Sequence, residues 1–161
     1  MTVRTLMLFG TDGVLLTAGG PERAPGAAEA LAVLRQRGDT VLSLATEEPA
    51  DRAQARTTAA GLDRYLDFTV GAYGSDTTDP ARLVGIARDR AAQAYGPVPA
   101  VVVVAAPDEV AWARAAPDVV VAAVHPAGAP GAVLDGLLSA GADHLVTDLR
   151  EVVALGIAYA G

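Results

Sequence analysis

The stretch "LMLFGTDGVLL" (residues 6–16) decides the fold and raises the functional question. Its apolar run stops at Gly10, and the pair Asp12 and Gly13 then opens a turn. This pattern is typical of a buried β-strand that delivers a loop to the edge of a sheet. One acid stands in that loop, and a glycine stands two positions before it. The stretch therefore predicts either a catalytic loop or the remains of one.

Strand-like and helix-like segments alternate along the whole chain. The runs "VVVV" (101–104) and "VVVAAV" (119–124) are apolar without alternation, which indicates strands buried on both faces. We therefore expect an open, doubly wound, mostly parallel α/β sheet flanked by helices, folded as a single domain over residues 1–161. The expected strands are residues 3–9, 40–46, 67–73, 100–106, 118–124 and 143–147, and the expected helices are residues 26–38, 49–61, 79–96, 107–116, 129–141 and 148–158.

Composition excludes several classes of function. The net charge of −7 argues against binding to nucleic acid or to an anionic membrane surface. Cysteine is absent, so disulfides and thiolate chemistry are excluded. The apolar stretch of the N-terminal segment "MTVRTLML" (1–8) is too short for a signal peptide, and we expect a cytoplasmic protein. All twelve basic residues are arginine, so no mechanism that requires a lysine can operate within this chain.

Five segments in order resemble one protein family. They are "LFGTDGVLL" (8–16), "PGAAEALAVLRQRGDTVLSLAT" (25–46), "AAGLDRYLDFTVGAYGSD" (59–76), "VVVVAAPDEVAWARAA" (101–116) and "GADHLVTDLREV" (141–152). Together they are similar to the motifs of the haloacid dehalogenase superfamily, which consists mostly of Mg²⁺-dependent phosphatases. The resemblance runs through nearly the whole chain and implies that fold, with a site at the carboxyl ends of the strands.

The same resemblance implies a set of catalytic positions, several of which have changed. The nucleophilic aspartate of the family falls on Gly10, which has no side chain with which to attack phosphorus. Asp12 keeps the place of the general acid and base, and Thr46 matches the second motif. The family's lysine falls near Thr77, and its metal-binding aspartate falls on Ala106. We therefore expect phosphatase activity to be absent.

The remaining acids make a poor metal and phosphate site. Asp12, Asp108 and Glu109 are weak candidates for Mg²⁺, which prefers near-octahedral oxygen ligands, and we expect no cofactor. Glu47 and Glu48 follow the second motif and would repel a phosphate dianion, and we expect that no base nearby offsets them. The candidate base is Arg82, on the helix expected at 79–96. Candidate binding residues at these strand ends are Thr11, Gly13, Glu47, Arg82 and His125.

Structural roles compete with these functional ones. An Asp-Gly pair makes a good turn after a strand, with the carboxylate of Asp12 accepting hydrogen bonds from backbone amides. Asp108 and Glu109 follow Pro107 at the start of a helix, where the helix dipole favours acids. Each side chain therefore has an explanation that needs neither substrate nor metal.

Three functions stay open on the sequence alone. The first is a non-catalytic protein that binds a partner protein, forms a homo-oligomer or regulates another activity. The second is a small-molecule enzyme that performs non-phosphoryl acid/base chemistry with Asp12. The third, a residual phosphatase, agrees least with the residues. The family's usual cap domain has no room here, because only residues 17–26 and 74–79 fill the two places where it is inserted.

Overall fold

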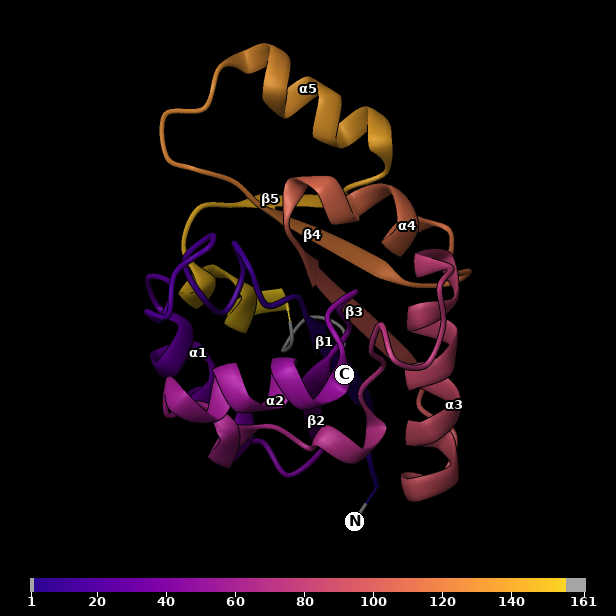
Figure 1. Cartoon of the computed structure of the whole chain (residues 1–161). Coiled ribbons are helices and arrows are strands. Elements are labelled where there is room, and N and C mark those ends of the chain that lie inside the picture. Colours follow the sequence, from indigo (N-terminus) through magenta and orange to yellow (C-terminus); the bar gives the residue numbers. More distant parts are fainter. Residues whose placement is uncertain (1, 156–161) are drawn as a thin grey trace.

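The computed structural model describes residues 2–155, which form a five-stranded sheet with helices on both faces (Figure 1). The strands are β1 (Thr5–Phe9), β2 (Thr40–Leu44), β3 (Ala100–Ala105), β4 (Val120–Val124) and β5 (His144–Val146). The helices are α1 (Ala27–Gln36), α2 (Ala50–Ala59), α3 (Leu83–Tyr95), α4 (Val110–Arg114) and α5 (Gly131–Ala140). Five short 3-10 helices are η1 (Asp63–Tyr65), η2 (Phe68–Val70), η3 (Pro80–Arg82), η4 (Pro107–Glu109) and η5 (Leu149–Glu151).

Every pairing in the sheet is parallel, and the strand order is β2-β1-β3-β4-β5. The chain runs from β1 outward to β2 and then returns to the other side of β1. The order therefore reverses between β1 and β3, and in open α/β sheets ligands bind outside the carboxyl ends of the strands at such a point. The doubly wound parallel fold expected from the sequence is confirmed.

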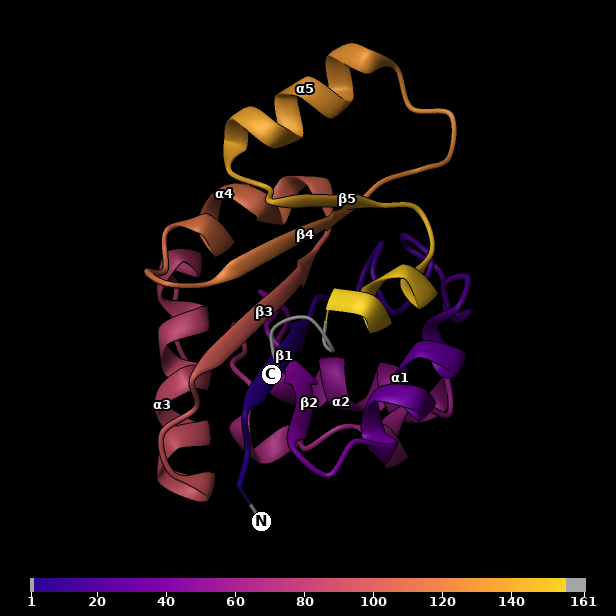
Figure 2. The ribbon, with the colours of Figure 1, turned by 180° about the vertical axis from the view of Figure 1, so that it is seen from behind.

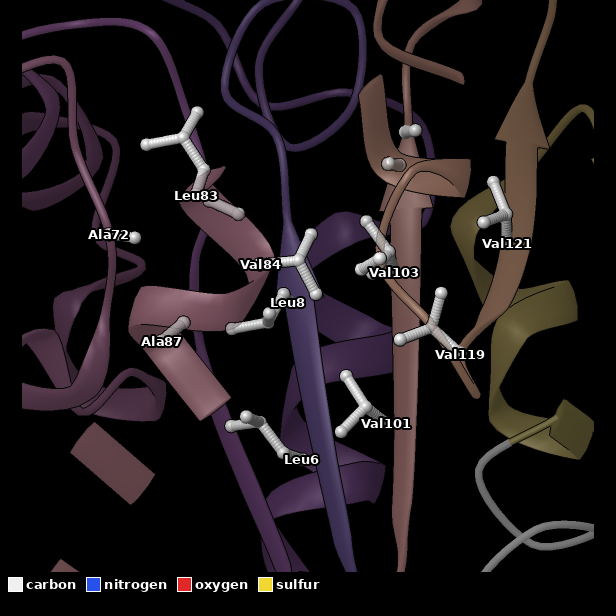
Figure 3. Packing of buried hydrophobic residues seen from close by; sticks show 14 of the residues in the cluster. Leu6, Leu8, Ala72, Leu83, Val84, Ala87, Val101, Val103, Val119 and Val121 are labelled. Atoms are coloured by element: carbon white, nitrogen blue, oxygen red, sulfur yellow. The ribbon is translucent and has the colours of Figure 1, made fainter. Parts of the chain in front are cut away.

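Alternate residues of the central strands face two separate cores. Leu6, Leu8, Val101 and Val103 point to one face, where α3 covers them with Val84 (Figure 3). Their neighbours along the strands, among them Met7, Phe9, Val102 and Val104, pack on the other face against α1 and α2. The uninterrupted valine runs are thus explained by burial on both sides of the sheet.

Residues 67–73 do not form the expected strand. The carboxylate of Asp67 accepts the backbone N–H of Thr69 at 3.1 Å, which closes the 3-10 helix η2. The segment meets β2 at two points only: the N–H of Asp67 donates to the carbonyl of Leu42, and the N–H of Ala72 donates to the carbonyl of Leu44. The carbonyl of Ala72 in turn accepts the N–H of Thr46. A local side-chain turn therefore overrides an apolar pattern that looked like a strand.

Three expected helices differ in detail from the structure. The segments expected at 79–96 and 107–116 each begin as a 3-10 turn, η3 and η4, before continuing as α3 and α4. The segment expected at 148–158 begins as η5 and is helical over residues 152–155, and its last three positions lie outside the described residues. Within residues 2–155, no helix has the length and hydropathy needed to cross a membrane.

The two places where a cap would be inserted hold short connections in the described chain. Residues 17–26 and 74–79 are turns and bends, so no cap is present among residues 2–155. Helix α5 lies at the β5 end of the sheet, beyond α4, as opposite views of the molecule show (Figures 1 and 2).

Candidate functional site

The loop after β1 makes a tight turn at the carboxyl edge of the sheet. Gly13 has a φ of +75°, a left-handed conformation that suits glycine, and its N–H donates to the carbonyl of Leu16 at 2.8 Å. The N–H of Leu16 in turn donates to the carbonyl of Thr11 at 3.0 Å. The turn keeps Asp12 at the surface, with its side chain 51% exposed.

The carboxyl group of Glu109 occupies the space beside Gly10. Its Oε1 accepts the backbone N–H of Ala106 at 2.8 Å, which anchors the carboxyl at the start of η4. A Cβ atom placed on Gly10 would overlap Oε1 of Glu109. The place from which a side chain at position 10 would act is therefore filled by an acid from a different strand end.

Glu109 is the most perturbed titratable group of this edge. Burial, with a smaller effect of the negative charges of Asp108, Glu47 and Asp12, raises its pKa to about 8, although the hydrogen bond from Ala106 acts in the opposite direction. Because this pKa lies above neutrality, the carboxyl is mainly protonated at pH 7. Asp108, its neighbour at the helix start, is exposed.

Two threonines and Glu48 connect β1 to β2. The hydroxyls of Thr11 and Thr46 lie 3.3 Å apart. Thr11 donates its hydroxyl hydrogen to Oε2 of Glu48 at 2.6 Å, and the N–H of Glu48 donates to the hydroxyl of Thr46 at 3.1 Å. Both hydroxyls are thus occupied by hydrogen bonds within the protein.

Arg56 of α2 pairs with an acid in the loop after β1 and with an acid in the loop after β2. Its guanidinium donates to Asp12 at 2.6 Å and also to Glu48. The hydrogen bond from Arg56 lowers the pKa of Asp12, so this carboxylate stays ionised at neutral pH. Arg52, one helical turn earlier, lies 3.6 Å from the same Glu48 with its side chain 70% exposed.

These loops enclose an acidic cavity of about 140 Å³. Five of its seven lining residues are acids: the full set is Thr11, Asp12, Thr46, Glu47, Glu48, Asp108 and Glu109. Among residues 2–155, no three or more His, Asp or Glu side chains are arranged to hold a metal ion. The structure therefore brings Thr11, Asp12, Thr46, Glu47, Asp108 and Glu109 together, as their strand-end positions indicated.

The other candidate residues lie elsewhere. Thr77 lines a separate cavity of about 260 Å³, where its hydroxyl accepts the N–H of Asp79. Arg82 ends η3 at the surface and is not among the residues that line the acidic cavity. His125 lines an apolar cavity on the other side of the β1 loop, together with Gly13.

Sequence reasoning missed the two residues that organise this edge. Glu48 was treated only as a repulsive charge, and Arg56 was not considered, so the expectation that nothing basic offsets the acids was wrong. Glu48 lies two residues before α2 and Arg56 lies within it, eight residues further on, a spacing that can place the two side chains on one side of the helix. The contact of Arg56 with Asp12 spans 44 residues and has no local signal.

Comparison with known proteins finds solved structures that share this fold. No protein-family model and no curated protein matches the sequence. Among solved structures, a haloacid dehalogenase-like protein from Agrobacterium tumefaciens matches with a TM-score of 0.63 and 24% identity over 87% of this chain. A haloacid dehalogenase-like hydrolase from Streptococcus pneumoniae matches with a TM-score of 0.64 and 17% identity over 83%.

A third structure, described as a dehalogenase, matches with a TM-score of 0.61 and 22% identity over 83% of this chain. The matches cover only 62%, 60% and 56% of these three longer chains. Likeness at this level of identity concerns the fold, and the chain has the haloacid dehalogenase-like α/β fold that its motifs resemble.

Proposed function

We propose that this protein has lost phosphoryl transfer and acts by binding rather than by catalysis. The observation that carries the proposal is the place of Glu109. Its carboxyl group lies against Gly10, in the space that a nucleophilic side chain on β1 would need. A protonated, buried carboxyl that already accepts a backbone hydrogen bond is a poor nucleophile toward phosphorus.

The charges at this edge support the same conclusion. Phosphoryl transfer depends on cations that stabilise the charge on the transferring group. Arg52 and Arg56 both reach the acidic loops, but they pair with Glu48, and Arg56 also pairs with Asp12. A phosphate dianion in this cavity would meet carboxylates on several sides and would have to compete with them for Arg56.

The test is a hydrolysis assay with an aryl phosphate and Mg²⁺. We expect wild-type protein to release no more phenol than the Asp12→Asn variant, because neither contains a nucleophile at position 10. Ser139→Ala, a change at an exposed position of α5 outside the acidic cavity, serves as the control for preparation-dependent contamination. Turnover that requires Mg²⁺ and disappears in Asp12→Asn, but not in Ser139→Ala, would contradict the proposal.

One observation favours a second candidate, a small-molecule enzyme with acid/base chemistry. The raised pKa of Glu109 makes it a proton donor near neutral pH, in a cavity that it shares with Thr11 and Thr46. Asp12, which the sequence pointed to for this role, is less suitable because Arg56 lowers its pKa. Under this candidate, Glu109→Gln would abolish a biosynthetic or degradative step in cells, whereas Asp12→Asn would reduce it less.

A further inference from the structure

A second, chemically different cavity lies at the same edge of the sheet. It has a volume of about 480 Å³, which is within the range of small-molecule sites. Its walls come from the loop after β1, the start of η4 and the segments after β4 and β5. Its lining includes Gly13, Thr17, Pro107, His125, Ala127 and Thr147.

The lining lacks acidic residues and arginine, which disfavours the binding of an ion. None of the residues that line the cavity is an aspartate, glutamate or arginine, although the chain carries 19 acids and 12 bases. The acidic cavity begins on the other side of the same turn, where Asp12 precedes Gly13. Because an uncompensated charge is costly in an apolar site, the lining fits a neutral molecule better than a phosphorylated one.

Three polar side chains lie within the apolar walls: Thr17, His125 and Thr147. The hydroxyl of Thr17 donates to the carbonyl of Glu22 at 3.5 Å. The carbonyl of Pro126 lies 2.9 Å from Nδ1 of His125 and can only accept a hydrogen bond. In the neutral imidazole, Nδ1 is therefore the donor and Nε2 the acceptor. Among residues 2–155 no hydrogen-bond partner of Nε2 is found, so it is available to a ligand that carries a hydroxyl or N–H group.

We propose that this apolar cavity binds a neutral, largely apolar small molecule that carries a hydrogen-bond donor. The proposal rests on the proposed function in one respect, because a protein that acts by binding needs a ligand site outside the acidic cavity. The ligand is distinct in chemistry from the phosphate esters that the resemblance to phosphatases implies, since the walls offer no cation for a phosphate.

Equilibrium titration with N-phenyl-1-naphthylamine tests the proposal. This probe is neutral and apolar, has one N–H donor, and becomes fluorescent in apolar surroundings. We expect saturable binding to the full chain that Ala127→Trp weakens by about tenfold or more, because the indole fills the cavity. Ala132→Trp is the matched control, since Ala132 is exposed on α5 and does not line the cavity.

A second pair of variants tests the effect of a charge on the cavity lining, separately from the effect of filling the cavity. Thr147→Glu places a carboxylate on the lining and is expected to weaken probe binding by about tenfold or more, because burial of that charge opposes ligand entry. Thr58→Glu adds the same charge to an exposed position of α2 and is expected to leave binding unchanged. Circular dichroism of all four variants checks that each is folded.

Two results would overturn the inference. One is the absence of saturable binding, or binding that Ala127→Trp and Thr147→Glu leave unchanged. The other is a concentration-dependent dimer in light scattering that Ala127→Trp disrupts and Ala132→Trp does not, because a second copy would then occupy the cavity. Neither result affects the proposed loss of phosphoryl transfer, which the aryl phosphate assay tests by itself.

Discussion

At the residue scale, Glu109 gives the protein a pH dependence of defined sign. Its pKa rises from the ordinary value of 4.5 to about 8 in the folded chain, so between these pH values the folded state holds a proton that the unfolded state releases. The raised pKa lowers the free energy of unfolding, because the unfolded state ionises Glu109 more easily than the folded state does. This loss of stability is absent below about pH 4.5, grows as the pH rises toward 8, and is complete above that value. At pH 7 it is on the order of 3 kcal/mol at 1.36 kcal/mol per pKa unit.

Glu109→Gln removes this loss of stability while retaining an oxygen that can accept the N–H of Ala106. We expect the variant to gain stability relative to wild type as the pH rises from 4.5 to 8, measured by urea denaturation at several pH values. Glu29→Gln makes the same change at an exposed position of α1 and is the control, which is expected to show no such gain. A wild-type stability that stays flat across this pH range would contradict the assignment.

A second residue-scale prediction concerns Arg56. Its side chain is 20% exposed and pairs with Glu48, which is 15% exposed, so Arg56→Gln leaves a mostly buried carboxylate without its strongest partner. We expect a loss of about 2 kcal/mol in the free energy of unfolding. Arg52→Gln removes the more distant and exposed partner of the same glutamate and is expected to cost less than about 0.5 kcal/mol. Equal losses in chemical denaturation would show that Arg56 does not organise the edge.

At the element scale, the connection after η2 is packed against the loop after β2. A Cβ atom placed on Gly74 would overlap the backbone carbonyl of Glu47, so Gly74→Ala requires one of the two loops to move. Gly85, in α3, has open space around the same added atom. The two glycines therefore give a matched pair of substitutions.

We expect Gly74→Ala to lower the free energy of unfolding by about 2 kcal/mol, because the overlap is with backbone and cannot be relieved by a rotamer change. Gly85→Ala is expected to raise it by about 0.5–1 kcal/mol, because alanine favours the helix. Thermal denaturation of both variants measures the pair. A Gly74→Ala variant as stable as wild type would mean that the loops are not in contact.

The elements also show what a sequence can predict and why. The strands at the centre of the sheet were predicted because valine runs buried on both faces have no other simple explanation. The prediction of a strand at 67–73 was wrong because the side chain of Asp67 closes a local turn, which the pattern of apolar residues does not reveal. Glu109 was correctly placed at a helix start, but its burial against Gly10 depends on two strand ends that are distant in sequence.

At the scale of the whole molecule, the chain has the haloacid dehalogenase-like α/β fold. At the carboxyl edge of its sheet, Thr11, Asp12, Glu48 and Arg56 form hydrogen bonds with one another. The contact of Arg56 with Asp12 and that of Glu109 with Gly10 arise only once the sheet is assembled. Function at such an edge depends on these tertiary contacts, which is why motif spacing alone left three functions open.

Orthovanadate tests most directly whether the acidic edge can hold a transferring phosphoryl group. Vanadate with Mg²⁺ mimics that group in the transition state, and a ligand that binds only the folded protein raises its unfolding temperature. We predict that the unfolding midpoint of the wild-type protein is unchanged by vanadate and Mg²⁺ together. A saturable increase in the midpoint that Asp12→Asn removes would contradict the account.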